Sequence, residues 1–364
     1  MNYLGSLIFY GIVIIITVVF TNLSLRVKGN LYRGIFKYCA ILVPSIVAGI
    51  RCNVGTDYNL YSKSFNLIKS NYDVGRYEDF EIGYKLLNKF VAYIGGNFNL
   101  LLFIMSFFTI LFMYKALVNE KENISVTFGM LVYMLMYYQT SLNLLRQCLA
   151  ISICIYAITC LNRKSIFNYL FYVLVASLFH RSALICLGII LVKYIFESEK
   201  MKVLKWAILG ISIFLVFNKQ IIGEIVGILL KSDYYSGYFL RETESGGSLI
   251  LYFIKILPIL LICVLASDKF KGNKNMRLYY YVILCGYILG ILRAFSMTQV
   301  QRISYYFTYL TVIVAPFAII NMPKKYLKTV QYIFVLYLVC KWYVDFFYNG
   351  YSETVPYQTF LFMN

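Results

Sequence analysis

Charged residues and histidine are scarce in this chain of 364 residues. Only 14% of the residues are charged, against about 25% in an average soluble domain. His180 is the only histidine, and the nine cysteines include no CxxC pair, so no metal-ligand spacing is present. The sequence also lacks a P-loop and the GxGxxG, GxSxG, HExxH and DxD motifs. ATP hydrolysis, zinc catalysis and metal-dependent nucleotide-sugar transfer therefore have no support, and we expect no cofactor and no metal.

Apolar residues are abundant instead, at 61% of the chain. Apolar runs of roughly 15 to 21 residues recur to the C-terminus, which is typical of a polytopic membrane protein. We predict an all-α fold, a single integral membrane domain over 1–364 that forms a bundle of about 12 transmembrane helices. The predicted spans are 4–25, 34–50, 98–115, 124–142, 144–162, 166–180, 183–196, 203–221, 249–266, 278–295, 303–321 and 329–347.

Basic residues fall mainly in one set of loops between these spans. Of the 34 Lys and Arg residues, 19 lie in this set, together with only five of the 16 acidic residues. Because Lys and Arg accumulate in cytoplasmic loops, these loops are predicted to be cytoplasmic and both termini to face outward. Most of the formal net charge of +18 is then explained by basic residues in cytoplasmic loops, which orient the protein in the membrane. We therefore expect no nucleic acid as a partner.

Two of the predicted outward loops are long, at about 51–97 and 222–248. In the first, apolar residues between Phe80 and Val91 recur at helical spacing, which predicts an amphipathic helix on the membrane surface. The same loop begins with Arg51, and Gly55 then precedes Asp57. Glycine permits a tight turn, so this segment could present backbone donors to an anion or could be an ordinary helix exit.

Five arginines map to the outer ends of spans, where the charge rule predicts few basic residues. They are Arg51, Arg146, Arg181, Arg293 and Arg302. A border arginine can simply extend to lipid headgroups. A guanidinium also offers a planar set of donors that fits phosphate oxygens, and a charge near membrane depth is by default a functional candidate.

His180 and Asp57 lie on the same predicted side as these arginines. The hairpin 143–182 would place Arg146 and His180 together, because its two arms cross the membrane in opposite directions. An imidazole with an unperturbed pKa of about 6.5 suits a general base near neutral pH, although His180 could equally cap a helix end. The abundant tyrosines near outward ends could stack on sugars or form an interfacial aromatic belt.

An ordered set of short motifs carries a family resemblance. The motifs are Arg51-Cys-Asn-Val-Gly-Thr-Asp57-Tyr58, Asp79-Phe80-Glu81-Ile82-Gly83-Tyr84, Leu145-Arg146-Gln147, Leu178-Phe179-His180-Arg181-Ser182, Arg302-Ile-Ser-Tyr305-Tyr and Val355-Pro356-Tyr357. In order and placement the chain resembles the EpsG-like branch of the Wzy-type bacterial polysaccharide polymerases, over most of its length.

The resemblance implies an enzyme of the bacterial cytoplasmic (inner) membrane with a GT-C-like helix bundle. Such a glycosyltransferase joins undecaprenyl-diphosphate-linked oligosaccharide repeat units into capsule, O-antigen or exopolysaccharide at the outer face. Its partners would be those lipid-linked oligosaccharides, the bilayer, and the flippase and chain-length regulator of the same pathway. A flippase or exporter, a polysaccharide ligase, and a non-catalytic scaffold remain alternative interpretations of the sequence.

A metal-free mechanism fits the residues, because arginines can neutralise a diphosphate leaving group. We predict Arg146, His180 and Asp57 as catalytic residues, with His180 or Asp57 activating the acceptor hydroxyl. Arg302 and Arg293 would join Arg146 at the donor diphosphate. The remaining predicted substrate-binding residues are Arg51 and Arg181, for a second diphosphate or the first loop, and Gln147, Tyr58, Tyr305 and Tyr357, for sugar.

Overall fold

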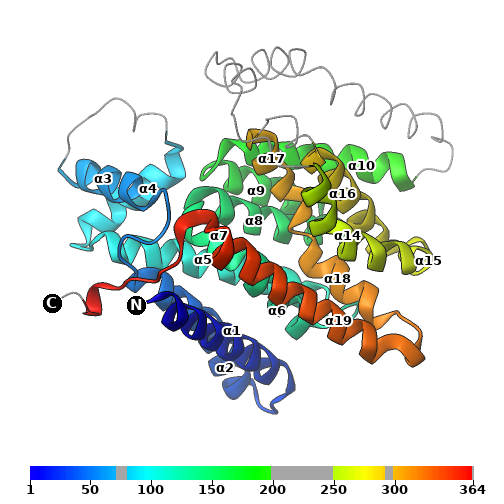
Figure 1. The fold of residues 1–364 in the computed structure, drawn as a ribbon. Coiled ribbons are helices and arrows are strands. Elements are labelled where there is room, and N and C mark those ends of the chain that lie inside the picture. Colours follow the sequence, from blue (N-terminus) through cyan, green and yellow to red (C-terminus); the bar gives the residue numbers. More distant parts are fainter. Residues whose placement is uncertain (71–79, 198–248, 292–297, 363–364) are drawn as a thin grey trace. The chain divides into compact units, whose positions relative to one another are not determined.

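The computed structural model of the protein describes residues 1–70, 80–197, 249–291 and 298–362 (Figure 1). The chain divides into two compact units, and each is described by itself. Unit 1 comprises Met1–Leu184 and Ala315–Asn364, and unit 2 comprises Ile185–Val314. The single membrane domain over 1–364 stays a prediction.

Every named element in the described residues is helical. Unit 1 contains α1 (Tyr3–Arg26), α2 (Asn30–Ile50), α3 (Tyr58–Lys69), α4 (Ile82–Tyr93), α5 (Phe98–Asn119), α6 (Val126–Met136), α7 (Tyr138–Asn143), α8 (Leu145–Asn162), α9 (Ile166–Ser177) and α19 (Lys324–Trp342). Unit 2 contains α10 (Ile189–Glu197), α14 (Leu249–Leu265), α15 (Ser267–Gly272), α16 (Lys274–Ile291) and α17 (Thr298–Thr308). The 3-10 segment η2 (Arg181–Gly188) and α18 (Thr311–Ile320) cross the boundary between the units.

Six helical stretches among the described residues are long and apolar enough to cross a membrane. They are Tyr3–Arg26, Asn30–Ile50, Phe98–Asn119, Leu145–Asn162, Arg302–Ile320 and Lys324–Tyr348, and three shorter apolar helices accompany them. The prediction of an all-α, polytopic membrane protein is confirmed. The predicted span 203–221 lies outside the described residues, and the figure of about 12 spans stays a prediction.

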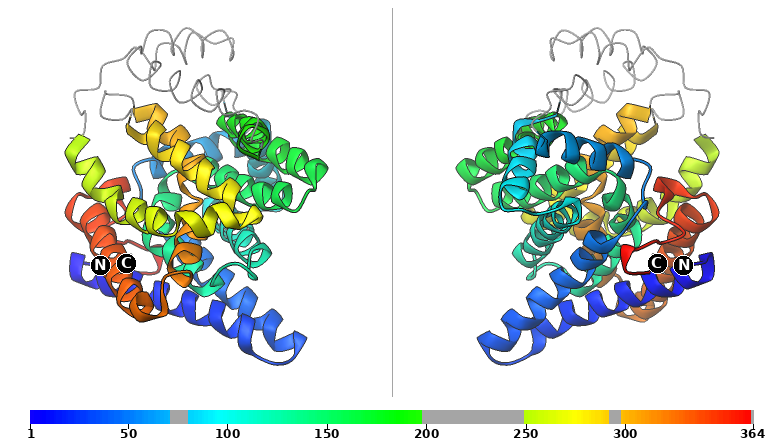
Figure 2. Two further views of the ribbon diagram at one scale, coloured as in Figure 1. Left: turned by 90° about the vertical axis from the view of Figure 1, so that its right-hand side faces the viewer. Right: turned by 90° about the vertical axis from the view of Figure 1, so that its left-hand side faces the viewer.

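The helix α1 has the polarity expected of a membrane helix and not of a soluble one. Its buried side includes Ser6, Thr17, Thr21 and Ser24, while large apolar residues such as Ile15 on the other side are exposed. Small and hydroxyl-bearing residues let membrane helices approach closely, and apolar residues face the lipid. In agreement, α1 packs along α2 as an antiparallel hairpin (Figure 2).

The predicted span 124–142 is interrupted in the structure, because α6 ends at Met136 and α7 begins at Tyr138. Polar groups of α7 explain the break, since they bond to other parts of unit 1. The Gln139 amide donates to Thr354 Oγ1 at 2.9 Å, and the Leu142 carbonyl accepts from the Arg51 side chain. A straight continuous helix is thus replaced by a short polar helix beside the beginning of α8.

The C-terminal segment returns to the beginning of the chain and to the loop after α2. The N-terminal amine of Met1 donates to the Tyr357 carbonyl at 3.2 Å, and Tyr357 N donates to Ser6 Oγ at 2.8 Å. The Cys52 amide donates to the Gln358 carbonyl at 3.0 Å. Both ends of the chain therefore lie at the same end of unit 1 as the α2–α3 loop, as the N and C marks show (Figure 2). That this end faces outward stays a prediction from the loop charges.

Unit 2 is tied together by tyrosine hydroxyls. Tyr252 on α14 donates to the Tyr287 carbonyl on α16 at 3.1 Å. The Tyr287 hydroxyl and Thr311 Oγ1 form a second bond of 2.9 Å. These bonds satisfy polar groups between apolar helices, where an unsatisfied group would be costly.

Candidate active site

The first of the loops predicted to face outward contains two short helices, α3 and α4. The second of them, α4, corresponds to the amphipathic helix that the apolar spacing predicted. On α4 the residues Tyr84, Asn88 and Val91 are buried, whereas Leu86 and Phe90 are exposed. The exposed apolar side chains are typical of a helix that lies at a membrane surface. The beginning of α4 then determines where the preceding residue, Glu81, lies.

Gly83 allows α4 to approach the end of α9 closely. Its amide donates to the Leu178 carbonyl at 2.8 Å. A Cβ at this position would lie 2.7 Å from that carbonyl oxygen, which is too close for any other residue without a shift. The absence of a side chain at Gly83 is therefore what brings Glu81 next to His180, two residues beyond Leu178.

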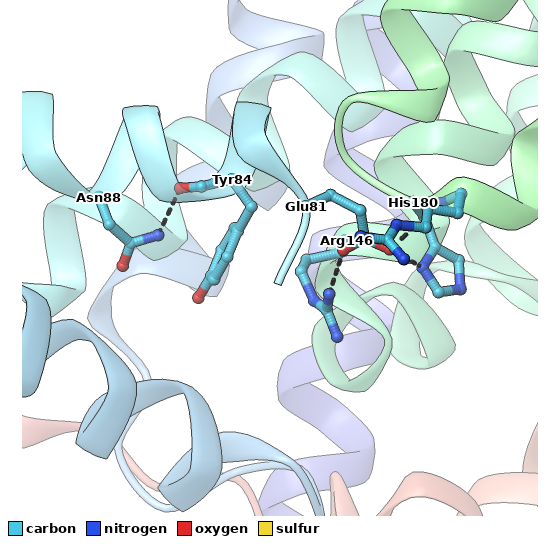
Figure 3. Close-up of polar contacts among 6 residues, drawn as sticks. Glu81, Tyr84, Asn88, Arg146 and His180 are labelled. Carbon is cyan, nitrogen blue, oxygen red and sulfur yellow. Dashed lines mark hydrogen bonds and ion pairs between the residues drawn. The ribbon is translucent and has the colours of Figure 1, made fainter. Parts of the chain in front are cut away.

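Glu81 is the centre of the polar cluster that forms there (Figure 3). Its Oε2 forms an ion pair with Arg146 Nη1 from the first turn of α8. Its Oε1 lies 2.9 Å from His180 Nδ1 and accepts a hydrogen bond from the Arg181 amide at 3.1 Å. One carboxylate thus joins three segments that are far apart in sequence, and we call Glu81, Arg146 and His180 the Glu81 cluster.

The surroundings of Glu81 keep its carboxylate ionised. Burial alone would raise the pKa of Glu81, but the hydrogen bond from His180 and the positive charge of Arg146 outweigh it and lower the pKa to about 2. The Glu81 side chain is only 5% exposed. A carboxylate so firmly held and so weakly basic is suited to orient its neighbours and is a poor proton acceptor.

Three aromatic rings surround the Arg146 guanidinium. Its central carbon lies 4.2 Å from the ring centre of Phe80, 5.6 Å from that of Tyr84 and 5.9 Å from that of Tyr61. Cation–π contacts of this kind stabilise a guanidinium that is removed from water. The side chain retains 17% exposure, and a guanidinium has five N–H donors, so the ion pair with Glu81 does not use up its capacity.

The contact with Glu81 defines the chemistry available to His180. An ionised carboxylate can only accept, so Nδ1 carries the hydrogen in their bond. In the neutral imidazole, Nε2 is then the atom with a free lone pair. Because the side chain is 26% exposed, a ligand could reach it. The arrangement can therefore hold an imidazole in one tautomer and orientation for proton transfer, as a carboxylate does in hydrolase triads.

Arg51, predicted to bind substrate, is completely buried, with 0% exposure. Its Nη1 donates to the Ala48 carbonyl at 2.8 Å and its Nη2 to the Leu142 carbonyl at 2.7 Å. Its Nε is buried without a hydrogen-bond partner. In the structure this guanidinium therefore connects the end of α2 to α7 through hydrogen bonds inside the protein.

Asp57 directly precedes the first residue of α3, and its backbone amide is held by Asn143. The Asn143 amide oxygen accepts from Asp57 N at 2.8 Å and from Thr56 Oγ1 at 2.9 Å. Gly55 has a φ of +103°, a conformation that other residues rarely adopt. The turn therefore lies against the junction of α7 and α8. Its partner there, Asn143, comes three residues before Arg146 in the sequence. The catalytic role of Asp57 stays a prediction.

The other predicted site residues differ in their accessibility. The Gln147 side chain is buried, and Tyr357 is buried with its hydroxyl donating to the Val47 carbonyl at 2.8 Å. Tyr58 is half-buried and packs on Phe98, while the Arg181 side chain is exposed. Their roles in sugar and phosphate binding stay predictions.

Arg302 and Tyr305 lie on α17 in unit 2, Arg302 exposed and Tyr305 half-buried. Arg293 lies outside the described residues. The roles of Arg302 and Arg293 in donor binding and of Tyr305 in sugar binding stay predictions.

Sequence reasoning missed Glu81 and Asn143 as site residues. Glu81 stands within the Asp79–Tyr84 motif that carries the resemblance, and it directly precedes the predicted amphipathic helix. The available signal was an acidic residue inside that motif, directly before the apolar helical spacing begins. Among the residues that the structure describes, no group of three or more His, Cys, Asp or Glu side chains could hold a metal ion, so we assign no metal ligand.

Comparison with models of known protein families identifies the family of this chain. The model of the EpsG family matches residues 34–359, which is nearly the whole chain and includes every residue of the Glu81 cluster. Searches of curated proteins and of solved structures found no match.

Proposed function

The chain belongs to the EpsG family, and we propose that it is a polymerase that joins lipid-diphosphate-linked oligosaccharides. The family itself is associated with polysaccharide biosynthesis in membranes. The finer proposal is that undecaprenyl-diphosphate-linked repeat units are the substrates and that the product is a capsule, O-antigen or exopolysaccharide chain. The reaction would occur at the outer face of the cytoplasmic membrane, which is the side predicted for the α3–α4 loop.

The Glu81 cluster is the observation that supports this proposal. It combines a held carboxylate, a partly exposed imidazole and a partly exposed guanidinium at a loop beside a membrane bundle. A transfer from a lipid diphosphate to a sugar hydroxyl needs a proton acceptor and cationic donors at the membrane boundary. The cluster supplies both without a metal.

In the proposed step an acceptor hydroxyl attacks the anomeric carbon of the donor sugar. The new bond joins the acceptor oxygen to that carbon, and the bond between the carbon and the diphosphate oxygen breaks. The electron pair leaves with the diphosphate, and the hydroxyl proton passes to His180 Nε2. Glu81 holds the imidazole through Nδ1 and stabilises the imidazolium that forms.

Arginines would neutralise the leaving diphosphate. Arg146 has donors beyond the one that it gives to Glu81, and Arg181 presents an exposed side chain next to His180. Guanidinium groups suit the paired oxygens of phosphates. Arg302 and Arg293 would contribute further donors, and Asp57 or the outer tyrosines would contact the acceptor sugar.

The test is to incubate purified, full-length protein with the lipid-linked repeat unit as the sole substrate. The proposal predicts a ladder of products that differ by one repeat unit. Translocation in sealed vesicles without a ladder would instead indicate a flippase. A transfer that occurs only after a different acceptor is added would indicate a ligase.

Two variants test whether the Glu81 cluster is responsible for the polymer products. We expect Glu81→Gln and Arg146→Gln to reduce chain elongation strongly while the protein still reaches the membrane. Lys85→Gln, on α4 four residues after Glu81, serves as the matched control and should elongate normally. If both cluster variants produced full-length polymer, the cluster would not be the catalytic centre.

A further inference from the structure

Unit 1 has a cavity of about 690 Å³ that the proposed reaction does not use. It lies among the end of α1, the beginning of α2, the end of α5 and the beginning of α6. Tyr156, in the second half of α8, also lines it. Every lining residue belongs to unit 1 and to the described part of the chain.

The cavity and the Glu81 cluster lie at opposite ends of α8. Arg146 stands in the first turn, and Tyr156 comes ten residues later, about 15 Å along the helix axis. The Asn119 amide at the end of α5 donates to Thr159 Oγ1 at 2.8 Å, still further from Arg146. Asn119 also lines the cavity. The cavity therefore opens at the end that the loop charges predict to be cytoplasmic.

Cations dominate the walls of the cavity. The charged lining residues are Arg26, Arg33, Lys37, Lys115, Lys121 and Glu122. The one carboxylate, Glu122, lies 3.8 Å from Lys121, and both of these side chains are exposed. The other four cations have no carboxylate partner in the described residues, so the cavity carries a net positive charge.

Two of the cations that line the cavity are less exposed than the others. Lys37 and Lys115 are half-buried, and Lys115 Nζ lies 5.6 Å from the ring centre of Phe112 and 5.8 Å from that of Tyr156. A half-buried ammonium without a counter-charge is unfavourable unless an anion accompanies it. Arg33 is fixed by its Nε–H, which donates to the Val27 carbonyl at 2.8 Å.

Neutral donors complete the surroundings. Val126 and Thr127, the first two residues of α6, line the cavity, and the unpaired amides at a helix N-terminus favour an anion. The Ser24 and Tyr114 hydroxyls are 2.9 Å apart and join α1 to α5 at the cavity wall. Ser24 Oγ donates to the Thr21 carbonyl at 2.6 Å, so Tyr114 donates to Ser24 and both protons are used within the protein. A polyanion with several oxygen atoms matches this set of donors.

The apolar surface beside the cavity indicates the source of the anion. On α1 and α2, Val19 is 47% exposed, Leu31 72% and Ile35 47%. These side chains would face acyl chains if a phosphate in the cavity belonged to a lipid. Basic pockets between transmembrane helices on the cytoplasmic side are suited to phospholipid headgroups.

We propose that this cavity binds the phosphate of an anionic phospholipid from the leaflet at the end of the bundle opposite the Glu81 cluster. The site is separate from the reaction centre, so it does not depend on the proposed polymerase activity. Its lipid would link α1, α2, α5 and α6 at that end.

The test uses the full-length protein in a mild detergent, with lipid binding followed by native mass spectrometry and thermal unfolding. The probes are dioleoylphosphatidylglycerol, the zwitterionic dioleoylphosphatidylcholine and inorganic phosphate. We expect phosphatidylglycerol to bind and to raise the unfolding temperature, with an affinity that falls as salt is added. Equal binding of phosphatidylcholine would overturn the proposal, and so would a response to inorganic phosphate as large as that to phosphatidylglycerol.

Variants then locate the bound lipid. Lys37→Gln combined with Lys115→Gln should weaken phosphatidylglycerol binding about tenfold or more. Lys28→Gln, in the same α1–α2 connection but outside the cavity, should leave it unchanged. If Lys28→Gln weakened binding as much as the double variant, the lipid would be attracted by the basic surface in general, and the cavity would not be the binding site. If the double variant does not fold, the comparison of the three probes on the unaltered protein still tests whether the protein prefers an anionic phospholipid.

Discussion

Arg51 and Arg146 follow the same pattern in sequence, yet the structure places them in opposite surroundings. Arg146 is partly exposed, is paired with Glu81 and lies against aromatic rings. Arg51 is fully buried, has no carboxylate partner in the described residues and donates to two backbone carbonyls. Both stand at the end of a helix that is long enough to span the membrane.

The difference indicates that cations at the predicted outer ends of spans need not share one role, since one can stabilise the fold while another is available to a ligand. A guanidinium that donates to carbonyls at a helix end satisfies groups that the helix leaves unpaired. A guanidinium that is paired and still partly exposed can exchange part of its bonding for a ligand. We infer that Arg51 is structural and that Arg146 belongs to the reaction centre.

The largest effect on activity is expected for His180→Ala. Removing a general base lowers rates typically by 10²- to 10⁴-fold. Because the His180 side chain is partly exposed, we expect the variant to fold. The measurement is the rate of repeat-unit addition by purified protein. Ser177→Ala, one turn earlier on the same arm, is the control. Wild-type rates for His180→Ala would remove the base assignment.

Arg51→Ala is expected to affect stability more than chemistry. The substitution leaves the Ala48 and Leu142 carbonyls without their donor and creates a cavity, which together destabilise by about 3 kcal/mol or more. Thermal unfolding in detergent measures this loss. The exposed Arg181→Ala should change stability by less than about 0.5 kcal/mol. A stable but inactive Arg51→Ala protein would contradict the structural role.

Gly83→Ala tests whether the position of α4 matters to the cluster. The added Cβ would meet the Leu178 carbonyl oxygen at 2.7 Å, so α4 and α9 must separate and Glu81 must move away from His180. A misplacement of about 1 Å can lower a rate about 10²-fold. Gly11→Ala on α1, where a Cβ has open space, is the matched control. Equal activity of both variants would show that the close contact between α4 and the end of α9 is not needed for activity.

The pH dependence of stability gives the smallest expected effect. The folded-state pKa of Glu81 is lowered from 4.5 to about 2, so its contribution is present above about pH 4.5 and is lost as the pH falls toward 2. A shift of this size corresponds to about 3 kcal/mol at most. Unfolding temperatures of the wild type and of Glu81→Gln should therefore differ at pH 7, differ less near pH 3 and converge only near pH 2. A constant difference would contradict the ion pair.

Much of this architecture could be predicted from the sequence, because apolar periodicity and length determine membrane helices directly. The hairpin 143–182 predicted that Arg146 and His180 lie at the same end of its two arms, and in the structure both contact Glu81. The amphipathic stretch from Phe80 likewise became α4. Local patterns were sufficient in each of these cases.

Glu81 and Arg51 could not be assigned in this way, because their roles depend on distant contacts. Glu81 meets Arg146 across 65 positions and His180 across 99, and no periodicity reports such a meeting. The burial of Arg51 depends on α7 and on the C-terminal segment, which returns from the far end of the chain. Tertiary packing alone distinguishes these charges.

A double-mutant cycle on Glu81→Gln and His180→Ala tests the central claim most directly. If Glu81 acts by orienting His180, the two residues act as a unit, and the elongation rate of the double variant equals that of His180→Ala alone. The rate is measured with purified protein and the lipid-linked repeat unit. Independent effects that multiply in the double variant, or unaltered elongation in both single variants, would contradict the account.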